Sequence, residues 1–181
     1  MDALAGPYAA AALLLILGGL LEVRRPRSAT EALAGLGASV PPPVVRVFAT
    51  SAVLVGVAAL VAGGGTGGRI AAGFVGLAYL GFAGFVGLAL ARAAPLASCG
   101  CFGRDDTPPT VTHLVLDLAG AGAALAVVLS PGDGFRGAVE HQPGAGIPFL
   151  VVTGVCAGLS YLVFTRAPRI ARPDGMRDPR G

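Results

Sequence analysis

Two cysteines separated by a single glycine, Cys99 and Cys101, stand in the short polar stretch ASCGCFGRDD at residues 97–106. A pair this close can cycle between dithiol and disulfide, can supply two thiolates to a soft metal, or can be incidental. A disulfide that closes so short a loop is strained and therefore easily reduced, which favours a catalytic pair over a structural one. Nearby arginines favour the reactive thiolate, whereas the two aspartates that end the stretch oppose it.

A second set of reactive side chains lies close by in the sequence. His113 and Asp117 are four residues apart in an apolar run, so a helix there places both on one face. We predict that Asp117 carries protons for thiol exchange and that His113 is the neighbouring acid or base. The alternative is that Asp117 pairs with an arginine such as Arg92 and only fixes helix packing. For Glu22, an ion pair with Arg25 is the simpler interpretation.

A metal site is the alternative chemistry for the same residues. Cys99, Cys101 and His113 offer three ligands, fewer than the four of a closed zinc site, whereas copper(I) accepts fewer ligands and prefers thiolates. The remaining cysteine, Cys156, lies in the middle of another apolar run and is expected to behave as a small apolar residue. No phosphate-binding loop, Ser-His-Asp set or nucleotide fingerprint is visible, so the sequence identifies no cofactor.

The composition shows which solvent surrounds these residues. Of the 181 residues, 54% are hydrophobic and 13% are charged, with a mean hydropathy of +0.75. Soluble domains carry roughly a quarter charged residues, so this chain lacks the charge to cover a water-facing surface. All 13 basic residues are arginines in short clusters between apolar runs, which is typical of membrane flanks and not of nucleic-acid binding.

Five apolar runs are long enough to cross a bilayer, which needs about 20 residues. They are Ala3–Val23, Val44–Ala62, Ile70–Ala91, Val111–Ser130 and Ile147–Phe164. The first run is followed, and not preceded, by its arginines, which is the reverse of a secretory signal peptide, so we predict that it is retained. The sequence therefore predicts an all-α integral membrane bundle, and the lipid bilayer is its first partner.

Two local patterns predict finer features. Ser28 and Glu31 have the spacing of a capping box, which indicates a short interfacial helix in the first loop, ended by the prolines at residues 41–43. In the third span, four glycines fall on about a third of the helix circumference. We expect this glycine face (Gly73, Gly76, Gly84 and Gly87) to pack inside the bundle, with a dimer seam as the alternative.

The arginines also predict the orientation. With five spans, eleven arginines fall on the side of the first loop, the third loop and the tail, and two, Arg69 and Arg136, fall on the other side. Cytoplasmic loops are enriched in basic residues, so the N-terminus is predicted outside and the C-terminus in the cytoplasm. The same rule places Cys99 and Cys101 on the cytoplasmic side.

The sequence resembles the MauE family, a membrane group related to the DoxX-like proteins. The resemblance rests on CGCFG at residues 99–103 after the third span and on GGLLEVRRP near the first, and it extends over roughly residues 5–130. It implies a four-helix bundle and a role in thiol redox chemistry with a thioredoxin-like partner. The substrate protein it implies is the disulfide-rich small subunit of methylamine dehydrogenase. On this chain the redox pair is Cys99 and Cys101, and Phe102 and Gly103 shape the loop.

The resemblance divides the chain into three parts. Residues 1–130 form the MauE/DoxX-like core, residues 131–164 an extra loop and a fifth transmembrane helix, and residues 165–181 a basic tail that is expected to be disordered. The chain departs from the family pattern in its fifth span and in Glu22, where a lysine is often found nearby. The resemblance also implies an exported thiol role, for which disulfide chemistry lies outside the cytoplasm, in conflict with the arginine bias.

Overall fold

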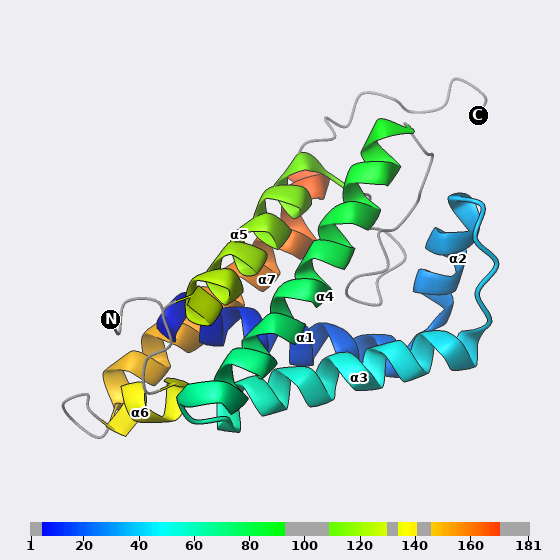
Figure 1. Ribbon diagram of the computed structural model, residues 1–181. Coiled ribbons are helices and arrows are strands. Elements are labelled where there is room, and N and C mark those ends of the chain that lie inside the picture. The colour runs from blue at the N-terminus through cyan, green and yellow to red at the C-terminus, as the bar shows by residue number, and fades with distance from the viewer. Residues whose placement is uncertain (1–4, 93–108, 130–133, 141–145, 171–181) are drawn as a thin grey trace.

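The computed structural model describes residues 5–92, 109–129, 134–140 and 146–170, all of them in helices or short connections (Figure 1). The helices in chain order are α1 (Ala5–Arg24), α2 (Arg27–Gly35), α3 (Pro42–Val61), α4 (Gly65–Ala91), α5 (Val111–Leu129), α6 (Gly134–Glu140) and α7 (Ile147–Ile170).

Among the described residues, α1, α3, α4 and α5 are long and apolar enough to cross a membrane, and α7 adds a shorter apolar stretch, Ile147–Val163. At 1.5 Å per residue a 20-residue helix is about 30 Å long, the thickness of the hydrocarbon core. Leucine, valine and phenylalanine side chains are exposed along all of these helices, as expected for surfaces that face lipid. The fold class predicted from the sequence, an all-helical membrane bundle, is confirmed.

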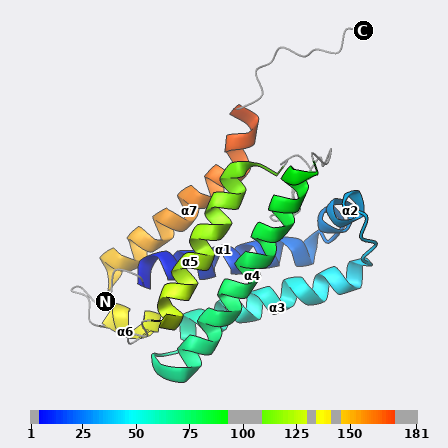
Figure 2. The same cartoon turned by 45° about the horizontal axis from the view of Figure 1, so that its top comes forward.

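The four long helices form two pairs, and each pair consists of long helices that follow one another along the chain. α1 lies beside α3 and α4 lies beside α5, and the two pairs cross at a steep angle in both views (Figures 1 and 2). α7 packs mainly against α1 and runs behind α5. We call these units the α1–α3 pair and the α4–α5 pair.

Small side chains form the core where the two pairs cross. Alanines from all four long helices lie within one buried cluster, which also holds Tyr8, Leu15, Val75 and Tyr79. Because alanine lets backbones approach closely, the pairs gain dispersion contacts in a solvent that supplies no hydrophobic driving force between helices.

The predicted helix in the first loop exists, but the capping prediction was wrong. α2 begins at Arg27 after Pro26, and no side chain caps its start. Ser28 lies inside the first turn and its hydroxyl donates to the carbonyl of Arg25 at 3.3 Å. The chain reverses at Gly37, whose φ of 90° suits glycine. The three prolines then begin α3, where proline fits the first turn, instead of ending α2.

The predicted glycine face is divided between two environments. A Cβ at Gly76 would lie 3.4 Å from the Cβ of Ala124, and one at Gly87 would lie 3.9 Å from Leu114, so both face α5. Gly73 and Gly84 have nothing within 4 Å of a Cβ. The prediction that the glycine face packs inside the bundle therefore holds for Gly76 and Gly87, which face α5.

Candidate functional site

The buried side of α5 changes from polar to apolar along its length. His113, Asp117, Ala121 and Ala124 recur at the spacing of one helix face, and all four are buried. His113 is 1% exposed and Asp117 is 4% exposed. An acid and an imidazole in the first two turns of a membrane-embedded helix are costly to bury, which makes this part of α5 a candidate functional site.

Thr110, just before α5, holds the histidine ring. Its hydroxyl oxygen and Nδ1 of His113 share a hydrogen bond of 2.7 Å. Fixing one ring nitrogen sets the orientation of the imidazole and restricts proton exchange to its other nitrogen. Thr110 was not predicted as a site residue. Its position three residues before His113 could have indicated that the two side chains meet.

Tyr79 brings a third polar group to the same level from α4. The side chain is 5% exposed, and its hydroxyl donates to the backbone carbonyl of Ala11 on α1 at 2.8 Å. The ring lies against Gly120, where a Cβ would be 2.9 Å from two ring carbons. Tyr79 also interacts electrostatically with Asp117, three residues before that glycine. A tyrosine in the middle of a membrane span needs a partner for its hydroxyl, which was the signal available in the sequence.

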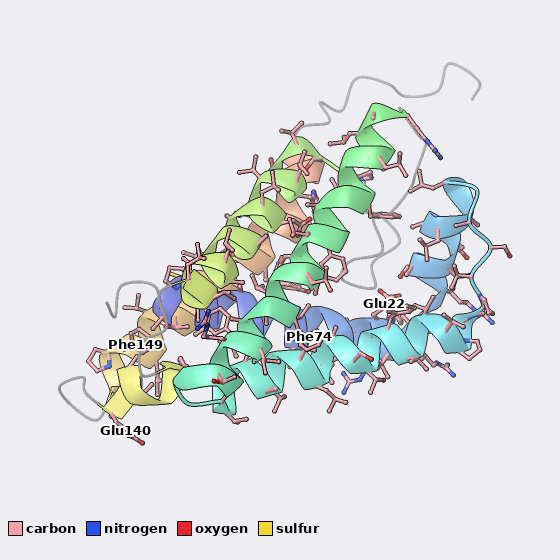
Figure 3. All side chains as sticks on the ribbon, viewed as in Figure 1. Glu22, Phe74, Glu140 and Phe149 are labelled. Carbon is pink, nitrogen blue, oxygen red and sulfur yellow. The ribbon has the colours of Figure 1, made fainter. Side chains whose placement is uncertain are left out.

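Glu22 lies in a different place, near the C-terminal end of α1. Its side chain is buried and lies on the part of α1 between α4 and α2 (Figure 3). Arg25, the ion-pair partner that the sequence suggested for Glu22, is exposed, and that pairing stays a prediction. A buried carboxylate on α1 and a buried acid–imidazole pair on α5 therefore belong to the two different helix pairs.

Arg92 ends α4 and joins it to α2. The side chain is exposed, and its Nη1 donates to the carbonyl of Leu36 at 3.1 Å. The end of α4 is thereby fastened to the end of the interfacial helix. The ion pair of Arg92 with Asp117, the alternative drawn from the sequence, stays a prediction.

Comparison with known proteins identifies the core. The family model described as methylamine utilisation protein MauE matches residues 3–130, well over half of the chain. The chain belongs to the MauE family. No curated protein and no solved structure matches it. The matched MauE segment contains the α1–α3 pair, the α4–α5 pair and both sets of buried polar residues, and it ends before α6 and α7.

The cysteine pair of the MauE core, Cys99 and Cys101, lies outside the described residues, as do Phe102 and Gly103. The loop that contains them connects Arg92, at the end of α4, to Pro109, just before Thr110 and α5. Cys156 is described, and it is a free, exposed cysteine on α7. The redox assignment therefore remains a prediction, and the structure describes the two helix ends between which the pair is connected.

The alternative metal site would use the same two cysteines together with His113. Across the described residues, no group of three or more histidine, cysteine or acidic side chains is placed to hold a metal ion. Of the three ligands predicted for copper(I), only His113 is described, and its Nδ1 is engaged by Thr110. The described residues include a set suited to holding and moving protons: Thr110 just before α5, His113 and Asp117 on α5, and Tyr79 on α4 near Asp117.

Proposed function

We propose that this multi-pass MauE-family protein is a thiol–disulfide redox protein whose reactive groups are Cys99 and Cys101. The observation that supports the proposal is the row of half-buried Thr110 and buried His113 and Asp117, which begins nine residues after Cys101. Thiol exchange moves protons as well as electrons, and a fixed imidazole and a buried acid next to the cysteine loop are suited to handling them.

The reaction is a balanced exchange between the dithiol of Cys99 and Cys101 and a disulfide of the partner protein. The thiolate of one cysteine attacks a sulfur of a partner's disulfide, which releases one partner thiolate and forms a mixed disulfide. The second cysteine then attacks its neighbour's sulfur and releases the other partner thiolate. The pair is oxidised to a disulfide, the partner is reduced to a dithiol, and two protons pass from the pair to the partner. The reverse direction oxidises the partner.

His113 and Asp117 act in the proton steps. His113 takes the proton of the attacking thiol or returns one to a leaving thiolate, and Asp117, one turn deeper, holds the proton between steps. The partner in this proposal is a thioredoxin-like protein. The family description points to methylamine utilisation, and the family resemblance implies the disulfide-rich small subunit of methylamine dehydrogenase as the substrate protein.

The cysteine loop faces the cytoplasm in this proposal. Five exposed arginines stand at one end of the molecule, where α1 ends, α2 and α3 begin and α4 ends: Arg24, Arg25, Arg27, Arg46 and Arg92. Arg69, at the other end of α4, is the exposed arginine of the opposite side among the described residues. The positive-inside rule then places the N-terminus outside and the tail in the cytoplasm.

Cysteine substitution is the first test of the redox role. Cys99→Ser and Cys101→Ser should each abolish exchange with a thioredoxin-type disulfide protein, measured by trapping mixed disulfides in the purified protein. Cys156→Ser is the matched control and should exchange at the wild-type rate. Equal activity of all three variants would rule out the proposal. Stoichiometric copper that is lost in Cys99→Ser would favour the metal alternative.

Labelling with a membrane-impermeant maleimide in intact cells tests the orientation. We expect Cys99 and Cys101 to be labelled only after the cells are opened. Labelling of intact cells after prior reduction would instead indicate an outward-facing disulfide, in agreement with the exported thiol role that the family resemblance implies.

A further inference from the structure

Tyr79 is held at three points, and together they fix its position beside Asp117. Its hydroxyl donates to the carbonyl of Ala11 at 2.8 Å, its ring lies on the backbone of Gly120, and Phe82 meets the ring edge-to-face with centroids 6.2 Å apart. Asp117 and Gly120 are three residues apart and share one side of α5. The ring therefore covers the turn of α5 that follows Asp117, on the side away from His113.

The hydrogen bond to Ala11 also determines what the phenol can do. A tyrosine hydroxyl has one proton to donate, and in Tyr79 the carbonyl of Ala11 accepts it. The oxygen has only acceptor lone pairs left for any other neighbour. Tyr79 therefore cannot donate its proton to Asp117 while this bond is intact.

Tyr8 provides a contrast in the same cluster. It is 4% exposed and packs in the core that also holds Tyr79, but its hydroxyl has no hydrogen-bond partner among the described residues. The two tyrosines are thus matched in residue type and burial, and they differ in the bond to α1 and in the proximity to Asp117.

We propose that Tyr79 is a positioning residue for Asp117. It holds the turn of Asp117 at a fixed distance from α4 and directs proton exchange toward His113 and the N-terminal end of α5. The inference deepens the proposed function and rests on it, because it assigns a direction to the proton traffic that serves Cys99 and Cys101. Loss of the hydroxyl removes the hydrogen bond between the ring and α1, so the position of Asp117 relative to α4 is no longer fixed.

A double-mutant cycle tests this role in the full-length protein, with oxidised glutathione as the disulfide probe. We expect Tyr79→Phe to slow exchange about tenfold in the wild-type background and to add no further loss in the Asp117→Asn background. Tyr8→Phe, the matched control, should change neither rate. If Tyr79→Phe slows exchange by the same factor in the wild-type and Asp117→Asn backgrounds, its role is merely structural and the proposal is overturned. An unchanged rate in the Tyr79→Phe single variant would also overturn it.

A second readout does not depend on thiol chemistry. Infrared difference spectroscopy can assign the carboxyl or carboxylate stretching band of Asp117 by its loss in Asp117→Asn. Tyr79→Phe should shift that band, and Tyr8→Phe should leave it in place. A shifted band together with an unaffected exchange rate in Cys99→Ser would support the positioning role and reject the proposed redox function. An unshifted band overturns the positioning role, whatever the cysteines do.

Discussion

The seams of the two helix pairs are both closed by glycines, but the groups that contact those glycines differ. In the α1–α3 pair a Cβ at Gly19 would lie 2.7 Å from the carbonyl oxygen of Ala49, and one at Gly56 would lie 2.6 Å from Ile16. In the α4–α5 pair the corresponding neighbour of Gly120 is the ring of Tyr79. At its two glycines the first seam brings backbone and aliphatic side chains together, whereas at Gly120 the second brings in an aromatic ring. The helix α5 of the second pair also buries His113 and Asp117.

The difference indicates that the two helix pairs have different roles. The close backbone approach of the α1–α3 pair is how helices associate in lipid, and it carries no reactive group at the two glycines. The α4–α5 pair accepts the cost of burying an acid and an imidazole, which is the mark of a functional site in a membrane protein. The first pair acts as the support, and through Ala11 it anchors the tyrosine of the second pair.

The comparison predicts its largest effect at Asp117. Asp117→Asn keeps the shape of the side chain and removes its ability to carry a proton, so the exchange rate should fall by roughly 100-fold or more. The unfolding midpoint in detergent should change little. The control is Thr50→Ala on the exposed face of α3, where the hydroxyl bonds only to the carbonyl of Arg46. If Asp117→Asn lowered the unfolding midpoint but left the exchange rate per folded molecule unchanged, Asp117 would serve stability and not exchange.

The next largest effect is expected in the α1–α3 seam. Gly19→Ala places a methyl group against the backbone of α3, which cannot move aside as a side chain can, so the free energy of unfolding should fall by about 1–3 kcal/mol. The exchange rate per folded molecule should stay at the wild-type value. Denaturant unfolding in micelles measures the first quantity.

Gly73→Ala is the matched control, since a Cβ there meets nothing within 4 Å. It should leave stability unchanged or raise it slightly through helix propensity, by up to about 1 kcal/mol. Equal destabilisation by both variants would mean that the α1–α3 seam is not the supporting contact.

A smaller and mixed effect is expected at Gly120. A methyl group there displaces a side-chain ring and not a backbone, so the free energy of unfolding should fall by an amount near the low end for overpacking, about 1 kcal/mol. Because the ring carries the bond to Ala11, the exchange rate should fall as well. Gly122→Ala, two residues on with open space around it, is the control and should change neither quantity.

The smallest effect is expected outside both seams. Arg92→Gln removes an exposed hydrogen bond to Leu36, so global stability should change by only a few tenths of a kcal/mol. Hydrogen exchange should nevertheless speed up in α2, Arg27–Gly35, because its end is no longer fastened to α4. Arg69→Gln at the opposite end of α4 should leave α2 unchanged, and equal exchange in both variants would contradict the link.

The long helices could be predicted from the sequence because membrane insertion is decided by local hydropathy. The predicted spans and the observed helices agree to within a few residues at the starts of α1, α3 and α5, whereas α4 begins at Gly65, five residues before the predicted start. The fifth span remains a prediction, since α7 has a shorter apolar stretch. The start of α2 was predicted wrongly because a local capping pattern competed with Pro26, which already provides a helical φ.

The candidate site was predictable only in part. His113 and Asp117 were visible as ionisable groups at helical spacing, and both are buried together as expected. Tyr79 was not, because its partner is a backbone carbonyl 68 residues away, and every residue has such a carbonyl. The tyrosine in an apolar run indicates that its hydroxyl needs a partner, but nothing in the sequence says which backbone carbonyl that partner is.

The pairing of sequence neighbours has a consequence for biosynthesis. α1 and α3 leave the ribosome before α4 and can associate in the bilayer as an early hairpin, and α4 and α5 can do the same later. The bond from Tyr79 to Ala11 forms only when the second hairpin docks on the first. A chain truncated after α3 should therefore insert into the membrane without His113 and Asp117, and the contacts of these two residues form last in the core.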